Sequence, residues 1–319
     1  MAIGPHPEFA WSVSRANLFD FCPRKYYYRY YGMWGGWQER ADEKTRLCYL
    51  LSRRTSLAGW AGQEVHRAIA SYLASDRAMS TIMDETRQRM RDQYRSSLSR
   101  QWLEPGGAKR FGLVEHYYEQ RLEDAVVRER WEQVAACLEA FAAAAYREDA
   151  RRARDAGRLV YVESPDEADF SRMGVSDHGL GDFRIYAQPD FAVGYEDGST
   201  CILDWKTGRP PAEGQDAVTD QLGLYALWAR EQLELDPEAR CVEAYEVYWP
   251  DEQSRGDRIG PERIAAALDH ARASVAEMHR RLVDPQANAA REQDFEPAAS
   301  EAKCAVCEYR AVCPDRVGG

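Results

Sequence analysis

The chain has 319 residues, of which 45% are hydrophobic and 30% charged, and its formal net charge is -11 at pH 7. This length and composition indicate a globular protein with one elaborated domain or two small ones. The acidic balance argues against a surface that is basic all over, such as a nonspecific duplex coat would use. It leaves room for a nucleic-acid enzyme, because carboxylates that hold metal ions are themselves negative. No stretch approaches the roughly 20 apolar residues of a membrane span, and the amino terminus lacks the pattern of a signal peptide, so we expect a cytoplasmic location.

The amino-terminal part, residues 1–78, is rich in aromatic and basic side chains. Cys22 opens the run CPRKYYYRYYG, which ends at Gly32. Rings that stack bases and cations that contact phosphates suit a path for a single nucleic-acid strand. The alternative is that these tyrosines pack in the core, and we expect half or more of them to do so. The basic side chains are the better candidates for contacts with a nucleic-acid backbone: Arg24, Lys25 and Arg29.

A helix is predicted over the segment GQEVHRAIASYL, in which Val65, Ile69 and Leu73 form an apolar stripe. His66 lies next to this stripe, four residues after Gly62. It would reach a site on a sheet if the helix packs there. A lone histidine at such a position is more often an ordinary helix residue than a ligand, so His66 alone does not indicate a function.

Residues 79–157 follow a nearly continuous helical pattern with mixed charge, interrupted near 104–112 (EPGGAKRFG). Blocks of alternating charge such as 146–154 (YREDARRAR) are typical of solvated helix faces with ion pairs between residues i and i+4. We interpret this part as a helical insertion without a functional motif.

The pattern then changes to short segments rich in β-branched and aromatic residues, which predict a small sheet. The expected strands are 159–163, 183–187, 191–195, 201–205 and 242–249. The Asp-Gly of the turn EDGS favours a hairpin between the third and fourth of them. Helices are predicted over 217–233 and 261–283, the latter with a proline at its start and one apolar stripe.

The candidate chemistry lies on this hairpin. Asp190 begins one strand, and Asp204 and Lys206 end its partner in the sequence ILDWKTG. Side chains alternate along a strand, so Asp204 and Lys206 project from the same face, and the hairpin brings Asp190 beside them. Two carboxylates and a lysine suit a site where a cation bound by oxygens polarises a phosphodiester. A surface ion pair is the alternative for D-x-K taken alone.

Further polar residues follow the hairpin. Gln221 and Tyr225 are four residues apart, so they share one face of the helix that comes soon after Lys206. Glu163, on the first predicted strand, is a possible extra acidic ligand.

Four cysteines form the remaining pattern. Cys304, Cys307 and Cys313 close the chain as C-x2-C-x5-C, and Cys22 lies near the other end. A tetrahedral or cuboidal metal centre needs four converging thiolates, so a shared centre would hold the two ends together. Free thiols or disulfides are the alternative, although disulfide frameworks belong to short secreted chains. We interpret the other cysteines as packing residues: Cys48, Cys137, Cys201 and Cys241.

Taken in order, these motifs resemble the PD-(D/E)XK nucleases of the RecB-like branch. The order is Cys22, G-x3-H, P-D, D-x-K-T-G, Q-x3-Y and C-x2-C-x5-C. More narrowly, they are similar to the iron-sulfur members of that branch, which include the CRISPR-associated exonucleases and the AddB nuclease domain. The resemblance spans residues 11–316. Asp204 departs from the glutamate that is more frequent in the family at this position.

The resemblance implies roles for the matching residues. His66, Asp190, Asp204 and the main-chain carbonyl of Trp205 would bind Mg2+ or Mn2+, and Lys206 would position the attacking water. Gln221 and Tyr225 would support the site and contact the nucleic-acid strand. A 4Fe-4S cluster would be held by Cys22, Cys304, Cys307 and Cys313. Zinc remains the alternative metal, because thiolate spacing alone does not choose between zinc and iron.

The fold expected from the resemblance is an α/β restriction-endonuclease-like core, a small mixed sheet flanked by helices, with a helical insertion and an iron-sulfur clasp joining the termini. We divide the chain into 1–78, 79–157, 158–250 and 251–319. The expected function is metal-dependent cleavage of DNA, of single strands or ends, in recombination, repair or defence. The alternatives are trimming of spacer precursors in CRISPR adaptation, or a catalytically silent DNA-binding subunit. No phosphate-binding P-loop is present, so unwinding would come from a helicase partner, and an integrase is the partner expected in CRISPR adaptation.

Overall fold

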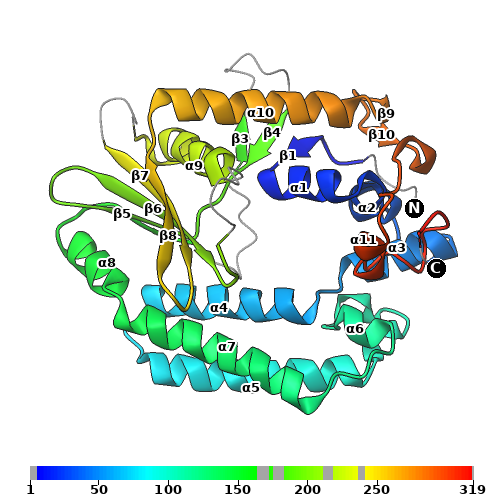
Figure 1. The fold of residues 1–319 in the computed structure, drawn as a ribbon, viewed down its shortest axis with the longest axis horizontal. Coiled ribbons are helices and arrows are strands. Elements are labelled where there is room, and N and C mark those ends of the chain that lie inside the picture. The colour runs from blue at the N-terminus through cyan, green and yellow to red at the C-terminus, as the bar shows by residue number, and fades with distance from the viewer. Residues whose placement is uncertain (1–5, 164–171, 175–182, 211–217, 236–240, 318–319) are drawn as a thin grey trace.

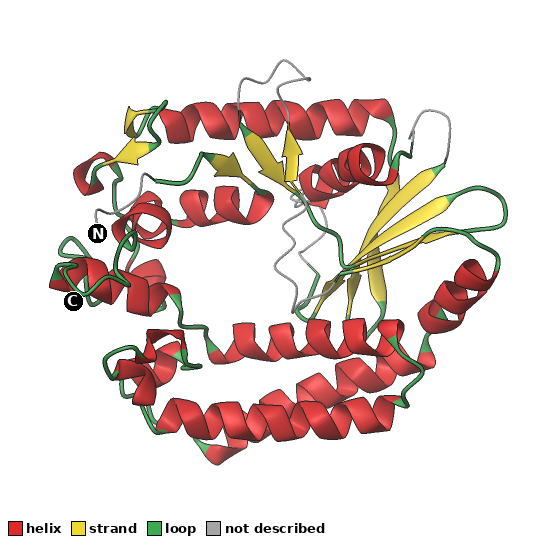
Figure 2. Cartoon of the chain, turned by 180° about the vertical axis from the view of Figure 1, so that it is seen from behind, coloured by secondary structure: helices red, strands yellow, loops and turns green. Residues whose placement is uncertain are grey.

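The computed structural model describes residues 6–163, 172–174, 183–210, 218–235 and 241–317, and it has a mixed α/β architecture (Figures 1 and 2). Its main sheet has five strands in the order β2-β5-β6-β7-β8. β6 and β7 are parallel, and the other neighbouring strands are antiparallel. The strands are β2 (Val160–Val162), β5 (Phe191–Gly194), β6 (Thr200–Lys206), β7 (Val242–Tyr248) and β8 (Gln253–Arg258).

The predicted hairpin is confirmed by the antiparallel pairing of β5 with β6. Its turn is closed by the Asp197 carboxylate, which accepts a hydrogen bond from the Ser199 main-chain N–H at 2.9 Å. Gly198 follows with a φ of 84°, a left-handed conformation that glycine adopts without steric cost. The local turn chemistry therefore fixes the register that sets Asp190 against the end of β6.

Helices cover both faces of this sheet. On one face, α9 (Val218–Leu233) and α10 (Pro261–His279) pack with the side chains of Ile202 and Ala244 in one core cluster. On the other face, α4 (Leu57–Ala74), α5 (Met79–Leu98), α7 (Asp124–Ala143) and α8 (Tyr146–Asp155) share a second cluster with Leu203 and Trp205. Figure 1 shows these two layers on opposite sides of the strands. Alternate residues of β6 therefore face different layers.

The described strands include several that were not predicted, and two differences, at β4 and β8, concern the main sheet. The segment predicted at 183–187 forms β4 (Arg184–Tyr186), but β4 pairs with β1 (Ala10–Trp11) and β3 (Arg172–Gly174) in a separate three-stranded sheet. The strand itself was predicted correctly, but its place in the main sheet was wrong, because its partner β1 comes from the far end of the chain. β8 was missed because its sequence, QSRGDR, is polar and mostly exposed, as befits an edge strand.

The segment 79–157 is helical, as predicted, and its expected interruption is present. Between α5 and α7 lie two short 3-10 turns, η2 (Gln101–Leu103) and η3 (Gly107–Lys109), and the short helix α6 (Val114–Tyr117). In α8, exposed arginines pair with acids one turn away, while Ala150 and Ala153 are buried. The solvated charged face predicted there is confirmed, but its ion pairs join residues i and i+3 and not i and i+4.

The described amino-terminal and carboxy-terminal elements lie together, as Figure 1 shows. The amino-terminal elements are α1 (Val13–Phe21), α2 (Pro23–Tyr27), the π-helical turn η1 (Tyr28–Gly32) and α3 (Glu43–Ser52). They pack against the carboxy-terminal η5 (Glu292–Asp294) and α11 (Glu301–Ala305), beyond the small pair β9 (Leu282–Asp284) and β10 (Ala289–Ala290). Lys303 donates a hydrogen bond to the Phe21 carbonyl at 2.9 Å, and Tyr28 donates one to Glu292 at 2.7 Å.

The tyrosine run is mostly core, as expected, because Tyr26, Tyr28 and Tyr31 are buried, while Tyr27 and Tyr30 are half-buried. None of the helices that the structure describes is both long and apolar enough to cross a membrane. The division of the chain into four parts stays a prediction.

Candidate active site

The end of β6 carries two of the predicted site residues. Asp204 is buried and Lys206 is half-buried, and both project toward α9 because they alternate with Leu203 and Trp205. Since Phe191 pairs with Leu203, Asp190 lies at the position opposite Asp204. The Trp205 main-chain N–H donates a hydrogen bond to the Asp190 carboxylate at 2.6 Å, which fixes its orientation. The proposed ligand role of the Trp205 carbonyl stays a prediction.

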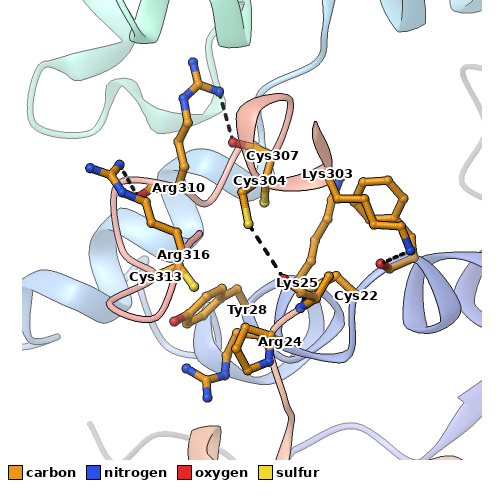
Figure 3. A pocket seen from close by; sticks show the side chains of 13 residues that line it. Cys22, Arg24, Lys25, Tyr28, Lys303, Cys304, Cys307, Arg310, Cys313 and Arg316 are labelled. Carbon is orange, nitrogen blue, oxygen red and sulfur yellow. Dashed lines mark hydrogen bonds between the residues drawn. The ribbon is translucent and has the colours of Figure 1, made fainter. Parts of the chain in front are cut away.

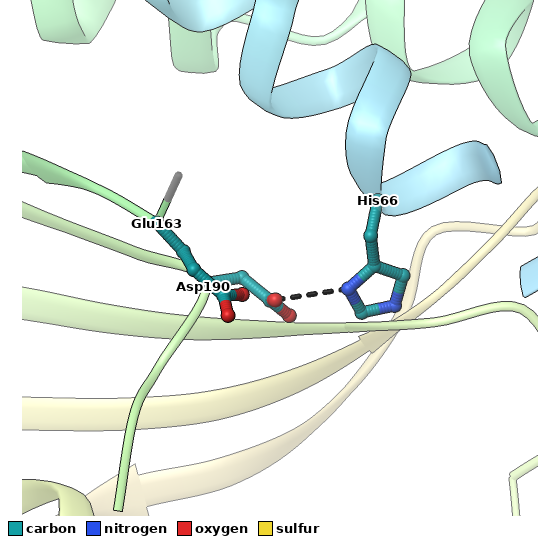
Figure 4. Close-up of side chains that lie close together, drawn as sticks. All are labelled: His66, Glu163 and Asp190. Atoms are coloured by element: carbon teal, nitrogen blue, oxygen red, sulfur yellow. Dashed lines mark hydrogen bonds and ion pairs between the residues drawn. The ribbon is translucent and has the colours of Figure 1, made fainter. Parts of the chain in front are cut away.

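His66 reaches Asp190 from α4. This helix begins after Ser56, whose hydroxyl accepts a hydrogen bond from the Gly59 N–H, and it buries an apolar face on the sheet. A Cβ added at Gly62 would lie 3.2 Å from the Thr207 hydroxyl, so the glycine lets α4 pass close to the end of β6. His66 Nδ1 lies 2.9 Å from Asp190 Oδ1, as Figure 4 shows.

Glu163 completes a group of possible metal ligands. It directly follows β2, and its main-chain N–H donates to the Asp190 carbonyl at 2.9 Å. One ligand atom from each of His66, Glu163 and Asp190 lies within 4.8 Å of the others (Figure 4). Carboxylate oxygens with one imidazole nitrogen suit Mg2+ or Mn2+.

The electrostatics of this group follow from crowding of acids. Burial alone would lower the pKa of His66, but the Asp190 carboxylate outweighs it and raises this pKa to about 9. Burial and the neighbouring Asp190 raise the pKa of Glu163 to about 8. Burial opposes ionisation of Asp190 too, yet the contact with His66 lowers its pKa overall. The site thus retains protons that a divalent cation would displace.

Asp204 is held by the helix α9. Its Oδ1 accepts a hydrogen bond from the Tyr225 hydroxyl at 2.5 Å and lies 3.3 Å from Gln221 Nε2. Gln221 Nε2 also donates to the Tyr225 hydroxyl at 2.5 Å. Burial and the charge of Asp190 raise the pKa of Asp204. The Q-x3-Y residues therefore orient a carboxylate of the predicted site.

Lys206 lies between two carboxylates. Its Nζ contacts Asp204 Oδ2 in an ion pair and lies 3.7 Å from Glu246 Oε1. Burial would lower the pKa of Lys206, but Asp204 outweighs it and raises this pKa. Glu246 is buried and accepts a hydrogen bond from Tyr248 at 2.6 Å.

Glu246 was not among the residues predicted from the sequence. β6 and β7 pair in parallel with Asp204 beside Glu246, and this register places the two acids around Lys206. The available signal was an acid at an inward position of a strand otherwise rich in apolar and aromatic residues.

The four predicted cysteines line one pocket between the chain ends (Figure 3). None of them forms a disulfide. Main-chain N–H groups approach two of the sulfurs: Ala298 N lies 3.3 Å from Cys22 Sγ, and Tyr309 N lies 3.4 Å from Cys307 Sγ. No three of the four sulfurs, all in described residues, lie mutually within 4.8 Å, so a closed ligand set is not present.

Two of the predicted nucleic-acid contacts have other partners. Arg24 is buried, donates to the Phe295 carbonyl at 2.6 Å, and pairs with Glu292 and Asp315. Lys25 pairs with Glu308 at 2.7 Å. These contacts join the chain ends, and a buried, paired guanidinium is a poor phosphate ligand, which argues against the prediction for Arg24.

Arg29 donates to the Ser52 carbonyl and lines a separate groove beside Gln221 and Tyr225. Its predicted contact with a nucleic-acid backbone stays a prediction.

A comparison of the sequence with models of protein families shows which family the chain belongs to. The model of the PD-(D/E)XK nuclease superfamily matches residues 10–314, almost the whole chain. The chain belongs to the PD-(D/E)XK nuclease superfamily. The mixed five-stranded sheet, with D-x-K at the end of β6, agrees with this membership.

Other comparisons add little to the superfamily assignment. No curated protein matches the chain. Among solved structures, the one described as "Crystal structure of SSO0001" is 11% identical with a TM-score of 0.23. The match covers 64% of this chain and 93% of that one.

Proposed function

We propose that this PD-(D/E)XK protein is a divalent-metal-dependent deoxyribonuclease that acts on single strands or free ends. The observation that carries the proposal is the convergence of His66, Glu163 and Asp190 within 4.8 Å, next to the Asp204–Lys206 ion pair. If Asp204 and Lys206 formed only a structural ion pair, there would be no reason for the ligand atoms of three other side chains to converge beside them. A cation site beside a lysine is the arrangement that phosphodiester hydrolysis uses.

In this proposal His66, Glu163 and Asp190 hold Mg2+ or Mn2+ with Asp204 beside them, and the bound ion would polarise the scissile phosphate. The remaining role in catalysis belongs to a side chain of the protein. Lys206, kept protonated by Asp204 and Glu246, donates to the attacking water or to the developing charge.

Other contacts keep the two aspartates in place. Tyr225 and Gln221 hold the Asp204 carboxylate. The Trp205 N–H holds Asp190. Cleavage of this kind serves recombination, repair or defence, beside a helicase or integrase.

Cleavage assays with matched variants test this function. Asp190→Asn keeps the size of the side chain but removes a charge from the proposed ligand set. We expect metal-dependent cleavage of end-labelled DNA by the wild type and loss of cleavage in Asp190→Asn. Asp84→Asn, at an exposed position of α5, is the matched control and should cleave normally. Equal cleavage by wild type and Asp190→Asn would contradict the proposed site.

We also propose that the cysteine pocket holds a 4Fe-4S cluster, as in the iron-sulfur members of the RecB-like branch. The support for this proposal is the single pocket that Cys22, Cys304, Cys307 and Cys313 line between the two ends of the chain. The spacing of the thiolates does not choose between iron and zinc, so the metal itself must be identified. The N–H groups near Cys22 and Cys307 would stabilise thiolate charge.

Chemical analysis of anaerobically purified protein tests the cluster. We expect iron and acid-labile sulfide at about four each per chain, as a 4Fe-4S cluster requires, and their loss in Cys307→Ser. Cys241→Ser, a cysteine outside the pocket, is the control and should retain both. Stoichiometric zinc without sulfide would overturn the cluster.

A further inference from the structure

A groove outside the carboxylate site adjoins it through shared residues. It lies between α1, η1, β4 and α9, and it encloses about 1310 Å3, part of it open to solvent. We call it the Arg15 groove and define it by Arg15, Arg29, Tyr30, Tyr186, Gln221 and Tyr225. The last two also contact Asp204, so a chain lying in the groove would continue directly into the proposed active site.

The centre of the groove is a stack of flat side chains. The Arg15 guanidinium carbon lies 4.4 Å from the ring centroid of Tyr30 and 5.4 Å from that of Tyr186. The Arg15 Nη1 donates to the Ala10 carbonyl at 2.7 Å, which holds the guanidinium between the rings. All three stacked side chains are half-buried, so each also presents surface to the groove. Planar rings and guanidinium groups are the surfaces on which unpaired bases stack.

The charge of the groove suits phosphates. None of its described lining residues is acidic, although the chain carries a net charge of -11. The partners of Arg15 and Arg29 given above are neutral carbonyls, and neither guanidinium forms an ion pair with a carboxylate of the described residues. Arg24 and Lys25 differ, because carboxylates neutralise them. The first residues of the nine-residue helix α1 also line the groove and add the positive end of a helix dipole.

We propose that the Arg15 groove binds single-stranded DNA next to the scissile phosphate, with a base stacked on the Tyr30–Arg15–Tyr186 platform and backbone phosphates near Arg29. The inference rests on the proposed nuclease function and names its substrate as a single strand. A duplex is disfavoured because its bases stack on one another and present only their edges.

Binding without cleavage separates this inference from the nuclease proposal. The probe is a fluorescein-labelled oligothymidylate, and its affinity is measured by fluorescence anisotropy in EDTA. We expect Arg15→Gln and Tyr186→Leu to weaken binding by about 5- to 150-fold, the range for loss of one base stack. Arg53→Gln is the matched control: Arg53 lies over the Tyr49 ring at 5.4 Å, outside the groove, and should change affinity less than twofold.

Two further measurements show that stacking is involved. A strand with abasic sites should bind wild type and Tyr186→Leu almost equally, because it has no base to stack. Photo-crosslinking of a strand containing 5-iododeoxyuridine to the wild-type protein should label Tyr30 or Tyr186, whether or not the variants fold. Unchanged affinity in folded groove variants, an equal defect on abasic strands, or crosslinks only outside the groove would overturn the proposal.

The two proposals fail in different ways. Groove-dependent binding in EDTA without cleavage in Mn2+ would retain the groove and reject the nuclease. Metal-dependent cleavage with no effect of Arg15→Gln or Tyr186→Leu on binding would retain the nuclease and reject the groove.

Discussion

Replacing Lys206 with methionine isolates the role of the cation at the end of β6. Methionine has similar length but no charge, so Asp204 and Glu246, whose side chains are 8% and 7% exposed, lose their shared cation. Removing one partner of a buried ion pair destabilises a protein by about 3–5 kcal/mol. We expect the low end of this range, because Tyr225 and Gln221 still hold Asp204.

The catalytic effect of Lys206→Met should be separate from metal binding. Loss of one positioned donor to developing charge slows catalysis by about 100- to 1000-fold. The affinity for Mn2+ should stay equal or become tighter, because the remaining acids no longer share their charge with an ammonium group. Single-turnover cleavage at saturating Mn2+ and calorimetric titration measure the two quantities.

The exposed Lys109, replaced in the same way, is the control for this experiment. A rate for Lys206→Met within threefold of the wild type would refute the role of the lysine. A parallel loss of Mn2+ affinity would mean that the site has collapsed.

Two more predictions concern metal binding and helix packing. Apparent Mn2+ affinity should tighten from pH 6 to pH 9 with proton release, because the ion displaces protons from His66 and Glu163, whose pKa values are raised to about 9 and about 8. Without metal, the proton on His66 stabilises the fold below pH 6.5, and this stabilisation is lost as the pH rises through 9. Mn2+ should therefore raise the melting temperature more at pH 9 than at pH 6. An equal rise at the two pH values would contradict the displacement of these protons by the ion. Gly223→Val should destabilise by about 1–3 kcal/mol in denaturant melts, because even a Cβ there would lie 2.7 Å from the Arg263 carbonyl of α10. Gly208→Ala, with open space around it, should be neutral, and equal stability of both variants would contradict the close packing of α9 on α10.

The local part of the site could be predicted from the sequence. The D-x-K spacing and the Asp-Gly turn act over a few residues, so strand alternation and turn chemistry suffice to bring Asp190 and Lys206 together. The G-x3-H spacing was also informative, because Gly62 permits the close approach that brings His66 to the sheet.

The parts that depend on distant pairing could not be predicted. Glu246 joins the site through a parallel register between strands that are about 40 residues apart, and periodicity within one strand does not give that register. The separate sheet containing β4 arises for the same reason, since β1 comes from the other end of the chain. The ion pairs of Arg24 could not be predicted either, because Glu292 and Asp315 come from the carboxy-terminal end of the chain.

The most direct test of the proposed active site is digestion of end-labelled single-stranded DNA by anaerobically purified protein in Mn2+, in Mg2+ and in EDTA, beside Asp204→Ala. We expect cleavage that requires a divalent metal and disappears in Asp204→Ala, although that variant stays folded and still binds DNA. Cleavage that persists in EDTA or in Asp204→Ala, or a wild type that binds DNA but never cuts it, would contradict the proposed active site.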